Sequence, residues 1–175
     1  PCAMVIDTDS GPLRVDSTAG VGLILQSSAG AQVAYSALDG AGGYENEGQS
    51  LWIVEVASKQ RRPVMREYAQ VREIREVRAA DGTALLVVRT EDGGAGMSHI
   101  AVIDPRRGQV ARMPRSLVAR VEGDTIELHS WNGEAPWSEP GGRDPATGLL
   151  RAPPESTTRI SLSELASRPT MENPR

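Results

Sequence analysis

The chain has 175 residues, which is enough for about one domain, because domains usually contain roughly 100–200 residues. Hydrophobic residues make up 39% of the chain and charged residues 24%, a balance that excludes wholesale disorder. The net charge of -4 at pH 7 argues against non-specific nucleic-acid binding, which needs a clustered positive surplus. We therefore expect residues 1–175 to form a single soluble, globular domain.

Short apolar segments separated by Gly, Asp, Pro and Ser turns run through the sequence, which is typical of an all-β domain. In chain order, the predicted strands cover residues 3–7, 13–17, 21–26, 32–37, 51–57, 63–68, 73–78, 84–89, 98–103, 109–113, 117–121, 125–131 and 158–162. Helical periodicity is almost absent. One helical turn is predicted over residues 163–167, because Ser161 and Glu164 form a Ser-x-x-Glu start.

The predicted strands recur in groups, with a period in the range of about 40–50 residues that is typical of repeat folds. One group covers residues 73–113 and has the turn Ala80-Asp81-Gly82 between its first two strands. Residues 21–68 show the same order, and a third group begins at residue 117. Residues 3–17 correspond only to the last two strands of a group. Four antiparallel strands joined by short turns and repeated in this way indicate propeller blades.

The stretch from Arg78 to Val88, followed by His99 to Asp104, resembles blades of TolB-type bacterial propellers. In those families an Asp-Gly turn joins the first two strands, as Asp81-Gly82 would here, and an aspartate closes the third strand. The resemblance is clearest over residues 71–115. It implies a scaffold, and scaffolds of this kind host many functions.

The length does not fit a closed ring, because known propellers generally need about four blades or more. We therefore predict an all-β antiparallel meander of propeller-blade-like four-stranded units, incomplete as a closed propeller. The chain could be a piece of a larger propeller or part of an oligomer that completes its sheets in trans. A β-sandwich is the alternative fold.

The connections between the second and third strands of each unit are long, and antiparallel pairing sends them to one face. Long loops on a rigid scaffold commonly carry binding function, and Trp and Tyr often dominate binding energy. The candidate binding residues on this face are Tyr44, Glu45, Glu47, Glu91, Asp92, Glu134, Trp137 and Glu139. The alternative is that these loops are solvated and that Trp137 packs on its own loop.

The connections between the third and fourth strands are predicted to emerge on the opposite face. The basic residues there are Lys59, Arg61, Arg62, Arg106 and Arg107. We therefore expect an acidic, aromatic face and a basic face on opposite sides of the domain.

Few residues could support nucleophilic catalysis. His99 and His129 are the only histidines, and no Gly-x-Ser-x-Gly elbow is present. We interpret His99 as a strand-start residue at a sheet edge. Because alternate residues of a strand point the same way, we expect His129 to share a solvated or half-buried face with Glu127.

Metal and nucleotide signatures are also missing. Two His and the single Cys2 are scattered and make no zinc spacing. The run from Asp7 to Gly11 begins like a calcium loop but lacks the Glu that the twelve-residue loop requires. The glycines at 40, 42 and 43 precede Glu45 and Glu47, whose charge would repel a phosphate. We expect no metal and no cofactor.

The chain opens with Pro1-Cys2-Ala3 and has no initiator Met, which a removed secretory signal would explain. No apolar run reaches the roughly 18–20 residues of a membrane helix. We expect an extracytoplasmic bacterial protein, periplasmic or secreted, with a protein partner or an oligomeric state. Nucleic-acid binding and a membrane span are not expected.

The favoured function is a non-enzymatic protein-binding module. One version is an inhibitory or immunity-type partner whose acidic, Trp-bearing loop plugs a basic cleft in another protein. The alternative is a β-scaffold hydrolase that acts on carbohydrate or peptide through loop carboxylates, which would require Glu47, Glu91 and Glu134 to converge. A purely structural segment of a larger assembly is a third possibility.

Overall fold

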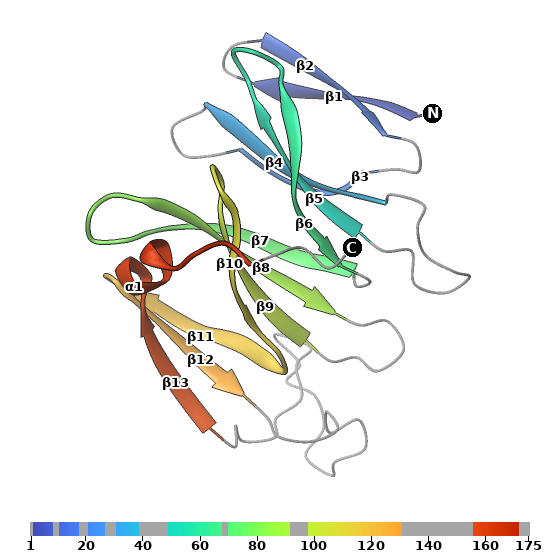
Figure 1. The fold of residues 1–175 in the computed structure, drawn as a ribbon. Coiled ribbons are helices and arrows are strands. Elements are labelled where there is room, and N and C mark those ends of the chain that lie inside the picture. Colours follow the sequence, from blue (N-terminus) through green and yellow to red (C-terminus); the bar gives the residue numbers. More distant parts are fainter. Residues whose placement is uncertain are drawn as a thin grey trace, which may run out of the picture.

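The computed structural model describes residues 2–8, 11–17, 21–26, 31–38, 49–67, 70–91, 98–130 and 156–171. These residues form thirteen strands and one short helix (Figure 1). All strand pairs are antiparallel, and the strands fall into four sheets in which sequential strands are neighbours. The fold is therefore all-β and built from meanders, as the sequence predicts.

The first two sheets contain the N-terminal strands. The first sheet consists of β1 (Cys2–Thr8) and β2 (Gly11–Ser17). The second sheet consists of β3 (Val21–Gln26), β4 (Gln32–Leu38), β5 (Gln49–Glu55) and β6 (Arg61–Glu67). Each predicted strand of this region overlaps one observed strand, and the half unit at the start is a two-stranded sheet.

The last two sheets contain the C-terminal strands. The third sheet consists of β7 (Gln70–Arg78), β8 (Ala84–Glu91), β9 (Ser98–Asp104) and β10 (Gly108–Met113). The fourth sheet consists of β11 (Ser116–Glu122), β12 (Thr125–Ser130) and β13 (Ser156–Ser161). The described strands of the four sheets do not close into a ring, and the all-β antiparallel meander is confirmed.

Helix α1 (Leu162–Ser167) follows β13 directly. Ser161 is its N-cap, and the Ser161 hydroxyl accepts a hydrogen bond from the Glu164 N–H at 3.2 Å. This bond satisfies one of the N–H groups that the first turn of a helix leaves unpaired. The predicted helix start is therefore confirmed.

The third sheet is buried on both faces. Leu85 and Val87 of β8 pack in one core cluster, and Leu86 and Val88 pack in another on the opposite face. Successive residues of a strand point to opposite faces, so the uninterrupted apolar run of β8 supplies both cores.

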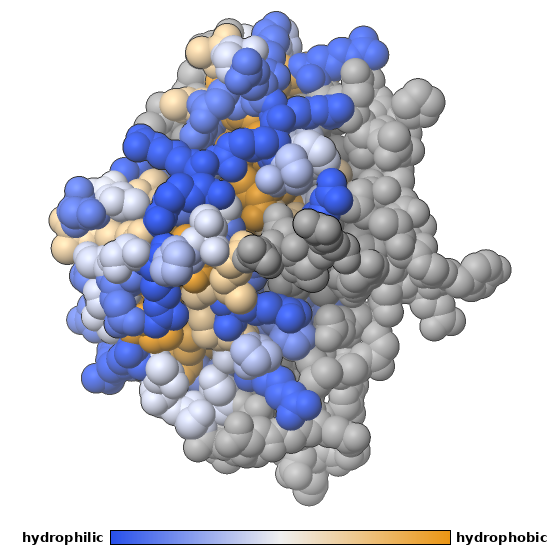
Figure 2. Space-filling model, viewed as in Figure 1, coloured by the Kyte–Doolittle hydropathy of each residue, from blue (hydrophilic) through white to orange (hydrophobic). Residues whose placement is uncertain are grey.

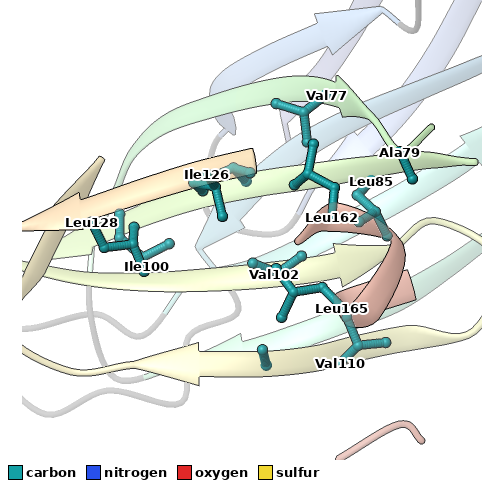
Figure 3. Packing of buried hydrophobic residues seen from close by; sticks show 12 residues of the cluster. Val77, Ala79, Leu85, Ile100, Val102, Val110, Ile126, Leu128, Leu162 and Leu165 are labelled. Carbon is teal, nitrogen blue, oxygen red and sulfur yellow. The ribbon is translucent and has the colours of Figure 1, made fainter. Parts of the chain in front are cut away.

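The first of these clusters joins the third sheet to the fourth sheet and α1 (Figure 3). Ile126 and Leu128 of β12, together with Leu162 and Leu165 of α1, pack against the third sheet and are at most 1% exposed. Burying an aliphatic side chain of this size contributes about 1.5–3 kcal/mol. The helix is therefore part of the core rather than an appendage.

The other two interfaces continue the stack. Leu51 and Ile53 of the second sheet contact the third sheet through the second cluster. On the far face of the second sheet, Tyr35 packs with Ile6 and Leu13 of the first sheet. The four sheets are thus packed face to face in chain order.

The short turns and the strand ends that flank the long connections lie at opposite ends of this stack (Figure 1). The β7–β8 and β11–β12 turns lie side by side. The N–H of Ala80 in the first turn donates to Oδ1 of Asp124 in the second turn at 2.8 Å. We call this the short-turn end. The strand ends that flank residues 39–48, 92–97 and 131–155 lie at the other end, toward the right and lower right of the view. We call that the long-connection end.

Candidate functional site

Of the predicted binding residues, the structure describes Glu91 alone. Glu91 is the last residue of β8, at the long-connection end, and its carboxylate lies 2.9 Å from the Arg72 guanidinium. The other predicted residues lie outside the described part of the chain: Tyr44, Glu45, Glu47, Asp92, Glu134, Trp137 and Glu139. Their convergence with Glu91 stays a prediction.

His99 lies near the start of β9 at the long-connection end, but the predicted position at a sheet edge is wrong. Strand β9 pairs with β8 on one side and β10 on the other, and His99 is buried. Its Nδ1 accepts a hydrogen bond from the Arg115 N–H at 3.4 Å. The error arose because strand order within a sheet depends on long-range pairing, which a local pattern does not reveal.

Arg115 is a feature that the sequence pattern did not signal. It lies in the turn between β10 and β11, is exposed, and has a φ of 52°. A non-glycine residue in this left-handed region costs roughly 1–2 kcal/mol. Strained residues of this kind gather at functional surfaces, although strain alone does not identify a function.

His129 and Glu127 share one face of β12, as predicted, and that face is the outer face of the fourth sheet. The Glu127 carboxylate lies 2.7 Å from Arg159, 3.3 Å from Arg120 and 3.6 Å from His129. The hydrogen bond from Arg159, with the nearby charge of Arg120, outweighs desolvation and lowers the pKa of Glu127. These residues form a surface ion-pair cluster between three strands.

A groove of about 680 Å³ opens between the second and third sheets at the short-turn end. Apolar side chains line its floor: Ala34 of β4, Ile53 of β5 and Leu86 of β8. The β7–β8 and β9–β10 turns border it, and Ala166 of α1 contributes to its lining. Figure 2 shows that hydrophilic residues cover much of the described surface and that apolar areas lie between them.

Three carboxylates border the groove, and each has a partner within the protein. Glu76 lies 2.8 Å from the Arg78 guanidinium. Asp81 accepts the Thr83 N–H at 2.8 Å, and this main-chain bond is the main reason that the pKa of Asp81 is lowered. Both carboxylates are engaged by groups of the protein, and Asp81 keeps its negative charge.

Asp104 is the third carboxylate, and it organises the β9–β10 turn. Burial opposes its ionisation, but the bond from Arg107 and the main-chain N–H groups of Arg106 and Arg107 outweigh burial and lower the pKa of Asp104. The Arg107 Nε lies 2.5 Å from Asp104 Oδ2, and the Arg106 N–H donates to Oδ1 at 2.8 Å. The aspartate predicted to close the third strand therefore has a structural role.

Arg107 also fixes the end of α1. Its guanidinium donates to the carbonyl oxygens of Ala166 and, at 3.1 Å, of Arg168. A cation at a helix C-terminus satisfies carbonyl groups that have no partner within the helix. Arg107, one of the basic residues predicted for this end, is therefore engaged by the fold and does not project freely.

Metal ligands do not gather in the described ranges. No three His, Cys, Asp or Glu side chains among those residues lie close enough together to hold a metal ion. In the same residues, no helix has the length and apolar character needed to cross a bilayer.

Comparisons with known proteins give no match to a protein-family model, a curated protein or a solved structure. The resemblance to TolB-type blades therefore depends on the sequence motifs alone. Function has to be argued from the residues of this chain.

Proposed function

We propose that this chain is a non-enzymatic protein-binding module that presents its long connections to a partner. The observation that carries the proposal is that three pairs of strand ends lie at the same end of the stack of sheets. Leu38 and Gln49, Glu91 and Ser98, and Ser130 and Ser156 are cross-strand neighbours at the long-connection end of three successive sheets. The described ends of these three connections therefore lie on one side of the fold.

The stack of sheets supports this role because it is a rigid base. Core clusters join each sheet to the next, and hydrogen bonds to Asp124 join the turns at the far end. A rigid scaffold reduces the ordering cost of association, so more of the contact energy contributes to affinity.

The competing hydrolase is less well supported. Such an enzyme needs a carboxylic acid that holds its proton near neutral pH. Of the three carboxylates that this hydrolase would use, Glu91 alone lies in the described part of the chain. Its carboxylate lies 2.9 Å from the Arg72 guanidinium and is therefore engaged within the fold, which favours binding over acid–base catalysis.

We also propose that the units are of the propeller type and that the protein acts outside the bacterial cytoplasm, in the periplasm or after secretion. Face-to-face stacking of sequential four-stranded meanders supports the first part. Fractionation of the native host, with antibody detection of the chain, tests the compartment.

The binding role is tested by comparing three versions of the full chain: wild type, a long-connection variant with Glu45→Gln, Glu47→Gln and Trp137→Ala, and Glu122→Ala at the short-turn end. Each is immobilised and exposed to native-host extract, and any retained protein is purified and titrated by calorimetry. We expect a purified partner to bind wild type and Glu122→Ala equally and the long-connection variant at least about tenfold more weakly. Equal binding to all three, or no partner, contradicts the proposal.

The hydrolase is tested in parallel. Wild type and Glu91→Gln are incubated with a panel of chromogenic glycosides and peptide amides. Turnover by wild type that Glu91→Gln abolishes would replace the binding proposal with the enzymatic one. We expect no turnover from either protein.

A further inference from the structure

The fourth sheet has one strand fewer than the second and third sheets, and β13 is one of its two edges (Figure 1). Strand β13 pairs with β12 on one side, and no described residue pairs with its other edge. An edge strand presents a row of main-chain N–H and C=O groups that can pair with a strand of another chain. The outer edge of β13 is therefore a candidate site for strand addition.

Strand β13 lacks the irregularity found at the other edges of the three larger sheets. A register shift interrupts the pairing of each of the other edge strands in these sheets, which are β3, β6, β7, β10 and β11. The β12–β13 register runs from Ser130–Ser156 to Thr125–Ser161 without a shift. Because a bulge twists an edge strand away from a new partner, the regular edge of β13 accepts another strand most easily.

The side chains of β13 also leave its outer edge accessible. The four consecutive residues from Ser156 to Arg159 are exposed, and successive residues of a strand point to opposite faces. The strand contains no Pro or Lys. Its one charged side chain, Arg159, lies 2.7 Å from Glu127 of β12, on the side away from the outer edge. Features that usually protect an edge strand are therefore missing from β13.

The sequence of β13 fits a second copy of itself in one antiparallel register. A pair centred on Arg159 would place two arginines directly opposite each other, and like charges in this position are destabilising. A pair centred on Thr157 would use only residues 156–158 of the strand. A pair centred on Thr158 uses residues 156–160 and places Arg159 opposite Thr157. Thr158 then lies opposite Thr158 of the second copy, and Thr–Thr pairs across strands are favourable.

We propose that two copies of this chain associate through their β13 strands, in an antiparallel pair centred on Thr158. The two three-stranded sheets then form one continuous sheet of six strands. Ile160 is a partly buried residue beside the cluster between the third and fourth sheets, and it gains a cross-strand neighbour in this pair. The contact is made by a sheet edge and not by the long connections, so it goes beyond the function proposed above.

The first test reverses one charge at the proposed contact. Sedimentation equilibrium of the full chain, over a wide range of protein concentration, measures the dimer dissociation constant. Thr157→Arg places an arginine opposite Arg159 twice in each dimer, so we expect dimerisation to weaken by about fivefold or more. Thr157→Glu places a carboxylate opposite Arg159 in the same geometry and should strengthen dimerisation. Circular dichroism and melting curves of both variants exclude unfolding as the cause of a loss.

The second test examines the register with single cysteines in a Cys2→Ser background. Directly opposed residues of antiparallel strands have Cα atoms about 4.5–5.5 Å apart, within the range of about 4.4–6.8 Å that a disulfide spans. Thr158→Cys should therefore oxidise to a covalent dimer. Glu164→Cys, at an exposed position of α1, is the control and should stay monomeric after oxidation.

Three outcomes overturn the proposal: a wild type that is monomeric at every concentration, equal dimerisation of Thr157→Arg and Thr157→Glu, or cross-linking of Glu164→Cys as efficient as that of Thr158→Cys. Partner binding by the long connections is judged separately, because the long-connection variant leaves β13 intact. That variant should dimerise as wild type does.

Discussion

The Asp124 carboxylate accepts the main-chain N–H of Ala80 at 2.8 Å, and this single bond joins turns of two different sheets. The same carboxylate accepts the hydroxyl groups of Ser161 at 2.5 Å and Ser163 at 2.7 Å. These serines lie at the start of α1, so one side chain connects the third sheet, the fourth sheet and the helix. The hydroxyl and main-chain donors lower the pKa of Asp124, with Ser161 contributing most.

Replacing Asp124 with Ala should lower the melting temperature by several degrees. The substitution leaves the Ala80 N–H without its partner and removes the acceptor for two serine hydroxyl groups. Differential scanning calorimetry of the full chain measures the effect. Glu122→Ala is the control, because the exposed Glu122 pairs only with Arg120, at 3.4 Å, within the described part of the chain. If both variants melt alike, Asp124 does not hold the sheets together.

Acid should destabilise the protein through its paired carboxylates. Because Asp104 has a lower pKa in the folded state than in the unfolded state, its contribution is fully present above the unfolded pKa of about 4. That contribution is lost as pH falls through the lowered folded value. Urea unfolding of wild type between pH 7 and pH 2.5 should show a loss of stability that begins near pH 4.

Asp104→Asn isolates the contribution of the Asp104 carboxylate to this pH dependence of stability. The amide does not ionise, so the variant should be less stable than wild type at pH 7, and the difference should shrink toward pH 2.5. A difference that stays constant over this range would show that the charge of Asp104 does not stabilise the fold.

Leu165→Ala should cost about 2–5 kcal/mol of unfolding free energy, because Leu165 is fully buried in the cluster beneath α1. Guanidinium unfolding followed by circular dichroism measures the loss. Met171→Ala, at a side chain that is 47% exposed, should change stability by less than about 0.5 kcal/mol. Similar values for the two variants would mean that α1 is not part of the core.

Arg115→Gly should stabilise the fold by about 1 kcal/mol, because glycine adopts a positive φ without the steric cost that arginine meets. Ala84→Gly, within β8 and without a positive φ, should instead lose roughly 0.5–1 kcal/mol. Urea unfolding of both variants provides the comparison. A loss of stability in Arg115→Gly would show that the arginine side chain supports the turn more than its backbone strains it.

The groove could not have been predicted from the sequence. Its lining comes from residues near 31–34, 53, 76–86, 104–107 and 166, which become neighbours only when the sheets stack. The basic character of the short-turn end was predicted from Arg106 and Arg107. The sequence did not show that Arg107 binds the carbonyl groups at the end of α1, because that contact joins residues about sixty positions apart.

The strands, the Asp81-Gly82 turn and the cap at Ser161 follow from local sequence. Alternation, turn preferences and capping act over a few residues, so their signals can be read along the chain. Three other features come from packing alone: β9 is a central strand, Asp124 bonds to Ala80, and both faces of the third sheet are buried. These features depend on which apolar face meets which, and that choice is made by packing between segments far apart in the chain.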